Sequence, residues 1–410
     1  MSDIPIPELE VSLLNDASNP LHTQLMAQSQ LDSLTKNLEV WTSSASNHAL
    51  RYHTHGIIRY FGKFPPPIAR HLIKSYTHEG DLVIDPMCGS GTTALESALL
   101  HRRVECMDVS PLSVLVSKVK TTHIKEAEFL LWAQKVEEIV LKDKSRSSQT
   151  LIGLRNPEHW FLPETTKSLT KIKKAIESLN APEEIKAALM VTFVSIVRRV
   201  SRATSQQGRL FLDVETAEKD ALPFFMKKAK ANAKSLDALP TDSDISIHQA
   251  SLLDDQASQD AKGDLLICHP PYFNNYKYSG VYSLELSWLN YDHASIRKQE
   301  VREAFKIGNP DKLGAYLDDM EVALKHCHAM IKKNGVMALM IGDTILREKY
   351  LPVTKLLLDR ISDLFSVELV ALRVPQFTEA SWAASQRRLG GKVGVSLSDF
   401  VVILRKKDGK

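Results

Sequence analysis

The stretch DLVIDPMCGSGTTALESALLHRRVECMDVSPL, residues 81–112, decides the fold of this chain. A short aliphatic run ends at Asp85, two glycines follow with a serine between them, and apolar residues then recur at helical spacing. A second strand-like run ends at Asp108. Strand, glycine-containing loop, helix and strand in this order form one βαβ unit of a doubly wound sheet. The segment therefore predicts an α/β fold.

The rest of the chain continues this pattern with one long interruption. Residues 125–240 have helical spacing, many Lys and Glu residues and few strand signals. We therefore expect an α/β core in two pieces, 51–124 and 241–410, split by a helical insertion over 125–240. Residues 1–50 are polar and weakly patterned, which predicts an N-terminal arm. Further strand-like runs lie at 245–253, 264–268, 336–343, 365–374 and 399–407.

Composition limits the class of protein. Of the 410 residues, 43% are hydrophobic and 25% charged, which is typical of a globular protein. A net charge of +3 is too small to indicate a nucleic-acid partner by itself. Four cysteines without CxxC spacing indicate reduced thiols in a cytoplasmic protein, with neither a disulfide scaffold nor a metal site. The N-terminus is polar and no apolar run could span a bilayer, so we expect neither a signal peptide nor a membrane partner.

The loop DPMCGSGTT, residues 85–93, has the features of a ligand-binding turn. Gly89 and Gly91 let the backbone turn tightly and approach a ligand, and the following helix offers free N–H groups. The loop lacks the Gly-Lys-Ser/Thr element of a Walker loop and is not a full GxGxxG. Asp108, at the end of the second strand, is placed to accept hydrogen bonds from ribose hydroxyls. The pattern favours a nucleoside ligand without phosphates.

A second informative stretch is DLLICHPPYFNNY, residues 264–276. Its aliphatic run predicts a buried strand of a parallel sheet. Pro270 and Pro271 cannot continue that strand, because neither can donate a ladder hydrogen bond. The chain therefore turns at the strand end and presents His269, a hydrogen-bonding side chain, and Tyr272, an aromatic face.

Four stretches together resemble one family. They look like motifs of the S-adenosylmethionine-dependent amino-methyltransferases of DNA, which methylate N4 of cytosine or N6 of adenine. The resemblance covers roughly residues 52–124 and 245–405. It implies a Rossmann-like class I methyltransferase fold with a mixed seven-stranded sheet. The four stretches are GKFPPPIARHLI (62–73), VIDPMCGSGTTALESALL (83–100), MDVSPLSVLVSKVKT (107–121) and HPPYFNNYKYSGVYSLELSWL (269–289).

The same resemblance implies S-adenosyl-L-methionine as the cofactor. KFPPPI is similar to the motif that closes over the methionine end of that cofactor. The insertion, between the cofactor loop and the Pro-Pro-Tyr turn, is the implied target-recognition region. IGDT (341–344) also looks like a family element, to which the sequence assigns no role. The expected cofactor-binding residues are Lys63, Phe64, Pro65, Asp85, Pro86, Met87, Cys88, Gly89, Ser90, Gly91, Thr92, Thr93, Asp108, Ser251 and Leu252.

The catalytic residues implied by the resemblance are His269, Pro270, Pro271 and Tyr272. An exocyclic base amine is a poor nucleophile because its lone pair is delocalised into the ring. In the family, the residue before Pro-Pro and the first proline carbonyl accept the amine hydrogens, which localises the lone pair. The aromatic residue stacks on the base, which is flipped out of the duplex. Catalysis would then consist of positioning and electrostatics, without a covalent intermediate.

His269 departs from the Asp, Asn or Ser that the family usually carries. A neutral imidazole has one acceptor nitrogen for an amine hydrogen, whereas a protonated one has none. If its pKa is unperturbed, activity should fall on the acid side of about 6 to 7. Histidine leaves the modified base open, although the segment after Tyr272 looks like that of relatives that methylate cytosine N4. The alternative for His269 is a tolerated side chain, with the proline carbonyl sufficient.

Arginines in two places could contact DNA. Arg198, Arg199 and Arg202 follow an apolar helical run, with Arg209 beyond a polar loop. Arginines at i and i+4 share a helix face and can bridge phosphates, although cations at a helix end also oppose the macrodipole. Arg387 and Arg388 lie on a glycine-containing loop between the last two strands and are the second group of candidates.

The expected function is site-specific methylation of double-stranded DNA at an exocyclic amine, within a restriction-modification system or a regulatory one. A cognate restriction endonuclease is a possible partner, and the sequence does not distinguish a monomer from a dimer. Three alternatives stay open: an RNA base methyltransferase, a non-catalytic binding subunit and a nucleotide-binding oxidoreductase. The intact DPMCGSGTT argues against a decayed site, and the missing phosphate fingerprint argues against an oxidoreductase.

Overall fold

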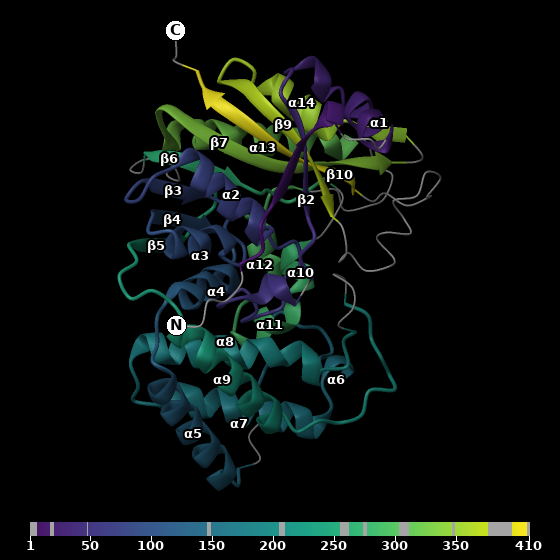
Figure 1. Ribbon diagram of the computed structural model, residues 1–410. Helices are drawn as coiled ribbons and strands as arrows, with labels where there is room; N and C mark the ends of the chain where they lie inside the picture. The colour runs from purple at the N-terminus through teal and green to yellow at the C-terminus, as the bar shows by residue number, and fades with distance from the viewer. Residues whose placement is uncertain are drawn as a thin grey trace.

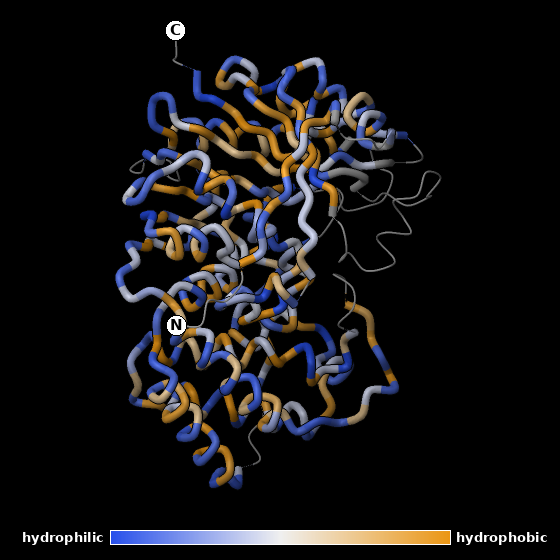
Figure 2. Tube along the Cα trace, viewed as in Figure 1, coloured by the Kyte–Doolittle hydropathy of each residue, from blue (hydrophilic) through white to orange (hydrophobic). Residues whose placement is uncertain are grey.

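The computed structural model describes residues 6–16, 20–46, 48–145, 149–204, 210–254, 262–273, 277–302, 311–346, 349–375 and 396–407. Figure 1 shows a twisted sheet flanked by helices, with a separate block of helices beside it. In Figure 2 the central strands are strongly hydrophobic, whereas many outer turns are hydrophilic. Within the described ranges, every helix falls short of the length and apolarity that a membrane crossing requires.

Seven strands form the centre of the sheet in the order β5-β4-β3-β6-β7-β10-β9. The first five are parallel to one another, and β10 runs antiparallel between β7 and β9. The chain order reverses between β3 and β6, which is the switch point of a doubly wound sheet. The Rossmann-like α/β class predicted from the sequence is therefore confirmed. The strands are β3 (Leu82–Asp85), β4 (Arg103–Asp108), β5 (Ile245–Gln249), β6 (Gly263–Cys268), β7 (Ile331–Leu346), β9 (Phe365–Pro375) and β10 (Ser396–Lys406).

Three more strands make the sheet larger than the seven strands expected. β8 (Lys349–Leu351) pairs with β7, while β2 (Leu38–Ser43) pairs with β9 and β1 (Glu10–Leu13) with β2. An uncovered β9 would expose a row of unpaired backbone groups, and β2 satisfies them. Trp41 of β2 is buried and its ring lies edge-on to His71, with 5.0 Å between centroids. Part of the segment expected to be an arm is thus integral to the sheet.

Helices cover both faces because neighbouring strand residues point to opposite sides. Val83 packs in one cluster with Ile68 of α2 (Pro66–Tyr76), and α3 (Thr92–Leu99) and α4 (Pro111–Thr121) contribute to the same cluster. Ile84, the next residue along β3, packs in another cluster with Tyr316 of α13 (Asp311–Met330) and with Leu357 of α14 (Val353–Arg360). The sheet is therefore a middle layer between two helical layers.

The insertion helices share one hydrophobic core with α3, with α4 and with the segment after the Pro-Pro-Tyr turn. Trp288 of α11 (Ser283–Trp288) is fully buried there, edge-on to Phe161 at 5.6 Å and to Phe193 at 5.7 Å. Figure 1 shows α11 next to α8, between the insertion and the sheet. The insertion helices are α5 (Glu126–Lys142), α6 (Pro157–Trp160), α7 (Pro163–Ser178), α8 (Glu183–Val200) and α9 (Leu222–Asp237).

The remaining elements are one ten-residue helix, α1, and several shorter helical segments. They are η1 (Leu14–Asp16), α1 (Pro20–Ser29), η2 (Leu31–Ser33), η3 (Ala49–Arg51), α10 (Tyr278–Val281) and α12 (His293–Arg297).

Asp343 explains the IGDT element. Its side chain is fully buried, and its carboxylate accepts hydrogen bonds from the Tyr350 hydroxyl (2.6 Å) and from the backbone N–H of Thr354 (2.7 Å). Tyr350 lies on β8 and Thr354 in the first turn of α14. The carboxylate therefore joins the end of β7 to the two elements that follow, and burial raises its pKa.

We expect Asp343→Ala to lower the free energy of unfolding by about 2–3 kcal/mol, because the buried Thr354 N–H and Tyr350 hydroxyl lose their acceptor. Tyr350→Phe removes a single donor and should cost about 1 kcal/mol. Urea denaturation of both variants measures the difference. Equal losses in the two variants would mean that Asp343 contributes only through Tyr350.

Candidate active site

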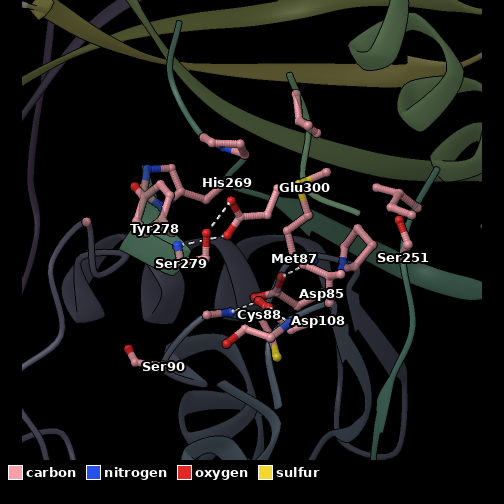
Figure 3. A pocket seen from close by; sticks show the side chains of 18 of the residues that line it. Asp85, Met87, Cys88, Ser90, Asp108, Ser251, His269, Tyr278, Ser279 and Glu300 are labelled. Atoms are coloured by element: carbon pink, nitrogen blue, oxygen red, sulfur yellow. Dashed lines mark hydrogen bonds between the residues drawn. The ribbon is translucent and has the colours of Figure 1, made fainter. Parts of the chain in front are cut away.

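A pocket opens at the carboxyl ends of β3, β4 and β6, where the chain order of the sheet reverses. Asp85 ends β3, Asp108 ends β4, and His269 directly follows β6. All three line the pocket, and Figure 3 shows them around one cavity. Doubly wound sheets bind their ligands at this position, because the helices on either side of a switch point diverge there.

The glycine loop forms the floor of the pocket in a conformation that needs its glycines. Gly89 and Gly91 have φ angles of +51° and +70°. A Cβ atom on Gly91 would lie 2.6 Å from the Ser117 hydroxyl oxygen and 2.9 Å from the Ser117 Cα. The residue after Gly91 begins α3, so the turn places a helix N-terminus directly behind the loop. Ser90, between the two glycines, is buried and also lines the pocket (Figure 3).

Two carboxylates hold this loop. Asp108 accepts hydrogen bonds from the backbone N–H groups of Gly89 (2.8 Å) and Ser110 (2.8 Å). Asp85 accepts one from the N–H of Met87 (3.2 Å). Burial raises the pKa of Asp85 to about 7 and that of Asp108 to about 6. A cationic ligand would favour their ionised forms.

The segment that begins KFPPPI forms the wall next to the loop. The Lys63 ammonium donates to the carbonyl of His55 (3.1 Å), and burial lowers the Lys63 pKa to about 7. The Phe64 ring lies 5.3 Å from that of His269, between centroids. Pro65 precedes the first residue of α2. Phe64 thus connects the predicted closing motif to the turn after β6.

At that turn, His269 Nε2 and the Tyr272 hydroxyl are 3.2 Å apart, and the two rings meet edge-on. Burial lowers the His269 pKa to about 4, with Asp399 opposing and Arg373 adding to the shift. The condition for a loss of activity near pH 6 to 7, an unperturbed His269 pKa, is therefore not met, and the imidazole is neutral at physiological pH. Asp399 and Arg373 pair with each other on β10 and β9.

Most of the expected site residues meet in this pocket. Pro65, Gly91, Thr92 and Thr93 are not among its lining residues, because they lie behind the loop or at helix starts. Pro270 and Tyr272 are buried beside it. The expected residues that line it are Lys63, Phe64, Asp85, Pro86, Met87, Cys88, Gly89, Ser90, Asp108, Ser251, Leu252, His269 and Pro271.

The sequence did not predict a further wall of the pocket, which includes Tyr60 and Tyr282. Tyr282 stacks on Tyr60 at 4.8 Å, and its hydroxyl accepts a hydrogen bond from the Phe61 N–H (2.6 Å). The spacing of Tyr278 and Tyr282 would place them on one helix face, which was an available signal. Glu300 and its neighbours carried no such signal. The missed lining residues are Tyr60, Gly62, Val109, Ser110, Ala250, Leu253, Tyr278, Ser279, Tyr282, Gln299, Glu300 and Val301.

Arg198 is corrected from a DNA contact to a structural ion pair. Its guanidinium is buried and donates to both oxygens of the Glu285 carboxylate, at 3.1 and 3.2 Å, and to the Val281 carbonyl. It also lies over the Phe61 and Tyr282 rings, at 5.2 and 5.7 Å. A buried guanidinium held in this way has no access to a phosphate. It attaches the insertion to the pocket wall instead.

The other arginines differ in position. Arg199 is exposed at the end of α8 and lies over the Phe224 ring at 5.4 Å. Arg202 lies beyond α8 and donates to the Val214 carbonyl (3.1 Å), so the expected i, i+4 helix face with Arg198 does not form. Arg209, Arg387 and Arg388 lie outside the described residues.

The four cysteines are buried free thiols, and Cys88 lines the pocket. In the part of the chain that the structure describes, no group of three His, Cys, Asp or Glu side chains is arranged to hold a metal ion.

Comparison with known proteins identifies Type II methyltransferases among the relatives of this chain. Residues 18–119 match the model of a family described as DNA methylase. Type II methyltransferase M.MjaII of Methanocaldococcus jannaschii is 30% identical over 128 residues, which are 31% of this chain and 22% of that protein. Type II methyltransferase M.BsoBI of Geobacillus stearothermophilus is 25% identical in an alignment 287 residues long that covers 61% of this chain and 55% of that protein. The chain thus spans only 22% to 55% of these relatives.

Solved structures include distant matches. The rRNA methyltransferase AviRa of Streptomyces viridochromogenes aligns over 88% of this chain and 96% of its own, with 12% identity and a TM-score of 0.34.

The two raised carboxyl pKa values predict that binding of a cationic nucleoside depends on pH. Lowering the pH from about 8 to 5 protonates Asp85 and Asp108 and removes negative charge from the pocket. We expect the affinity for S-adenosylmethionine to fall through this window, as calorimetric titration at several pH values would measure. Asp108→Asn keeps the shape of the side chain and should weaken binding at pH 8 by about 1.5–3 kcal/mol while flattening the pH dependence. If the affinity of that variant depended on pH as the wild type does, the pH dependence would come from a titratable group other than Asp108.

Arg198→Met should lower the free energy of unfolding by about 3–5 kcal/mol, because it leaves the Glu285 carboxylate buried without its partner. The matched control is Arg199→Gln, one residue along the same helix, which should change stability by no more than about 0.5 kcal/mol. Guanidinium denaturation measures both. A small loss for Arg198→Met would contradict the structural role of the ion pair.

Proposed function

Since the chain belongs, through residues 18–119, to the S-adenosylmethionine-dependent DNA amino-methyltransferase family, we propose that it methylates an exocyclic base amine in double-stranded DNA. The observation that carries this proposal is the placement of the His-Pro-Pro-Tyr turn. His269 and Pro271 line the same pocket as the glycine loop and its two carboxylates. A methyl donor in this pocket would lie within reach of a base at the turn.

S-adenosylmethionine is the cofactor of this family, and the pocket suits it. When bound, it supplies an electrophilic methyl group on a positively charged sulfur. Asp108 would accept hydrogen bonds from the ribose, since each of its oxygens retains a lone pair beyond the bonds to Gly89 and Ser110. The glycine loop would let the backbone approach the ligand, and Lys63 and Phe64 would border its amino-acid end.

His269 and the Pro270 carbonyl would orient the target amine. At neutral pH the imidazole carries one acceptor nitrogen, because its pKa is about 4. In the tautomer with the proton on Nδ1, Nε2 is that acceptor, and the Tyr272 hydroxyl 3.2 Å away can act as its donor in the free protein. An incoming amine would take the place of that hydroxyl. The proton lost by the amine would pass to solvent and not remain on His269.

We propose cytosine, methylated at N4, as the modified base in preference to adenine methylated at N6. The support is the likeness of the segment after Tyr272 to cytosine-N4 relatives. A cognate restriction endonuclease remains a proposed partner. The insertion is the proposed target-recognition region. Its attachment through Arg198 and Trp288 would keep its position relative to the pocket fixed.

The deciding experiment is methyl transfer from labelled S-adenosylmethionine to duplex DNA and to RNA, followed by mass spectrometry of the nucleosides. Formation of N4-methylcytosine in DNA is the expected result. N6-methyladenine in DNA would change the base but keep the class of reaction. Label in RNA alone, or none in either polymer, would contradict the proposed function.

Tyr272 should contribute to methyl transfer through its ring. Tyr272→Ala removes a stacking surface worth about 1–3 kcal/mol per base and should reduce the single-turnover methylation rate, with cofactor affinity near wild type. Tyr272→Phe keeps the ring and should retain much of the activity. Equal inactivity of the two variants would show that the hydroxyl next to His269 matters more than stacking.

Arg199 is the exposed arginine that we propose as a phosphate contact. Arg199→Gln should weaken binding to all duplexes alike, because phosphates carry no base information, and should reduce the slope of log affinity against log salt by about 0.9. Filter binding at several salt concentrations measures the slope. A slope equal to that of the wild type would mean that DNA does not contact Arg199, and Arg387 and Arg388 would be the next candidates.

A further inference from the structure

Glu300 is a pocket residue that no sequence motif indicated. It lies just after α12, between Gln299 and Val301, and all three residues line the pocket. Its carboxylate accepts hydrogen bonds from the backbone N–H of Ser279 (2.9 Å) and from the Ser279 hydroxyl (3.0 Å). Its side chain is only 10% exposed. The carboxylate is therefore held in a defined position at the pocket wall.

This wall faces the two aspartates. Figure 3 shows the Glu300 carboxylate beside Ser279, across the cavity from the Asp85 and Asp108 side chains. The charge of Glu300 contributes to the raised pKa of Asp108, although burial contributes more. The three acidic side chains therefore contribute negative charge to the same pocket.

Positive charge within the pocket is scarce. Among the described residues that line it, the basic side chains are Lys63 and His269, with pKa values lowered to about 7 and about 4. Arg297 donates to Glu300 (3.1 Å) but does not line the pocket. Several carboxylates enclosed together repel one another unless a ligand brings positive charge or hydrogen-bond donors. The pocket thus suits a cationic ligand rich in donors.

We propose that Glu300 is a cofactor-binding residue that favours the sulfonium cofactor over its neutral thioether product. The inference rests on the proposed function. In methyl transfer the sulfur–methyl bond breaks, a nitrogen–methyl bond forms, the amine releases a proton and the sulfur loses its positive charge. An acidic pocket attracts the sulfonium and attracts the thioether less. Glu300 therefore assists both cofactor capture and release of S-adenosylhomocysteine.

The test compares two affinities in one variant. Glu300→Gln keeps the size of the side chain and removes its charge. By calorimetric titration we expect S-adenosylmethionine to bind about tenfold more weakly and S-adenosylhomocysteine less than about threefold more weakly, which lowers the ratio of the two affinities. Equal weakening of both ligands, or no change in either, would overturn the proposal.

Arg297→Gln is the opposite and matched variant. It removes the positive partner of Glu300 and leaves the carboxylate in place. If Glu300 acts through its charge, this variant should bind S-adenosylmethionine as well as wild type or better, and the preference over S-adenosylhomocysteine should rise. If the Arg297–Glu300 pair only holds the segment in shape, the two variants should lose affinity alike, which would overturn the proposal.

Ser279→Ala separates the charge from the wall contact. It removes the hydroxyl bond to Glu300 but keeps the backbone bond and the carboxylate. Affinity for S-adenosylmethionine should fall less than in Glu300→Gln, and a loss as large as in Glu300→Gln would mean that Glu300 serves only to hold Ser279. Failure of the wild-type protein to bind S-adenosylmethionine would remove the proposed function together with this inference. Wild-type binding with an unaltered Glu300→Gln variant would remove this inference alone.

Discussion

The pairing of β3 with β6 is the constraint on which the site depends. Val83 and Ile84 lie opposite Leu265 and Leu266 in parallel register, and the Asp264 carboxylate accepts a hydrogen bond from the Leu82 N–H (3.0 Å). This contact joins segments separated by the whole helical insertion. Because parallel neighbours end at the same edge of a sheet, it sets the glycine loop beside the His-Pro-Pro-Tyr turn. Without that register the two motifs would remain unrelated stretches of chain.

The insertion is attached to the pocket by apolar packing and by one buried ion pair. Trp288 lies in the insertion core, a few residues after the tyrosines that line the pocket. Arg198 of α8 spans the same boundary through Glu285 and the Phe61 and Tyr282 rings. A buried ion pair adds little net stability, but removing one partner costs about 3–5 kcal/mol of stability. The pair therefore fixes the insertion to the pocket wall. A helical insertion attached in this way would move with the pocket and not independently of it.

Charge is distributed unevenly over the site. The pocket carries the acidic side chains of Asp85, Asp108 and Glu300, whereas the Pro-Pro-Tyr turn carries a histidine that burial keeps neutral. A protonated His269 would add positive charge next to a cationic cofactor, whereas the neutral imidazole can accept a hydrogen bond. The environment of His269 thus leaves it able to accept a hydrogen bond, as the acceptor role proposed for it requires.

Local patterns in the sequence were sufficient to predict the α/β class, the glycine loop, Asp108 and the turn after β6. Each of these depends on neighbouring residues: strand runs, φ angles that favour glycine, and prolines that end a ladder.

Contacts between distant segments could not be predicted from such local patterns. The arm residues that form β2 were missed because this short strand is stabilised by its neighbours β9 and β1 rather than by its own sequence. Arg198 was misread because its burial depends on Glu285, 87 residues away. Glu300 has no signature, since only the packing of the segment after α12 turns it towards the aspartates. The lowered pKa of His269 likewise follows from burial, which no local pattern encodes.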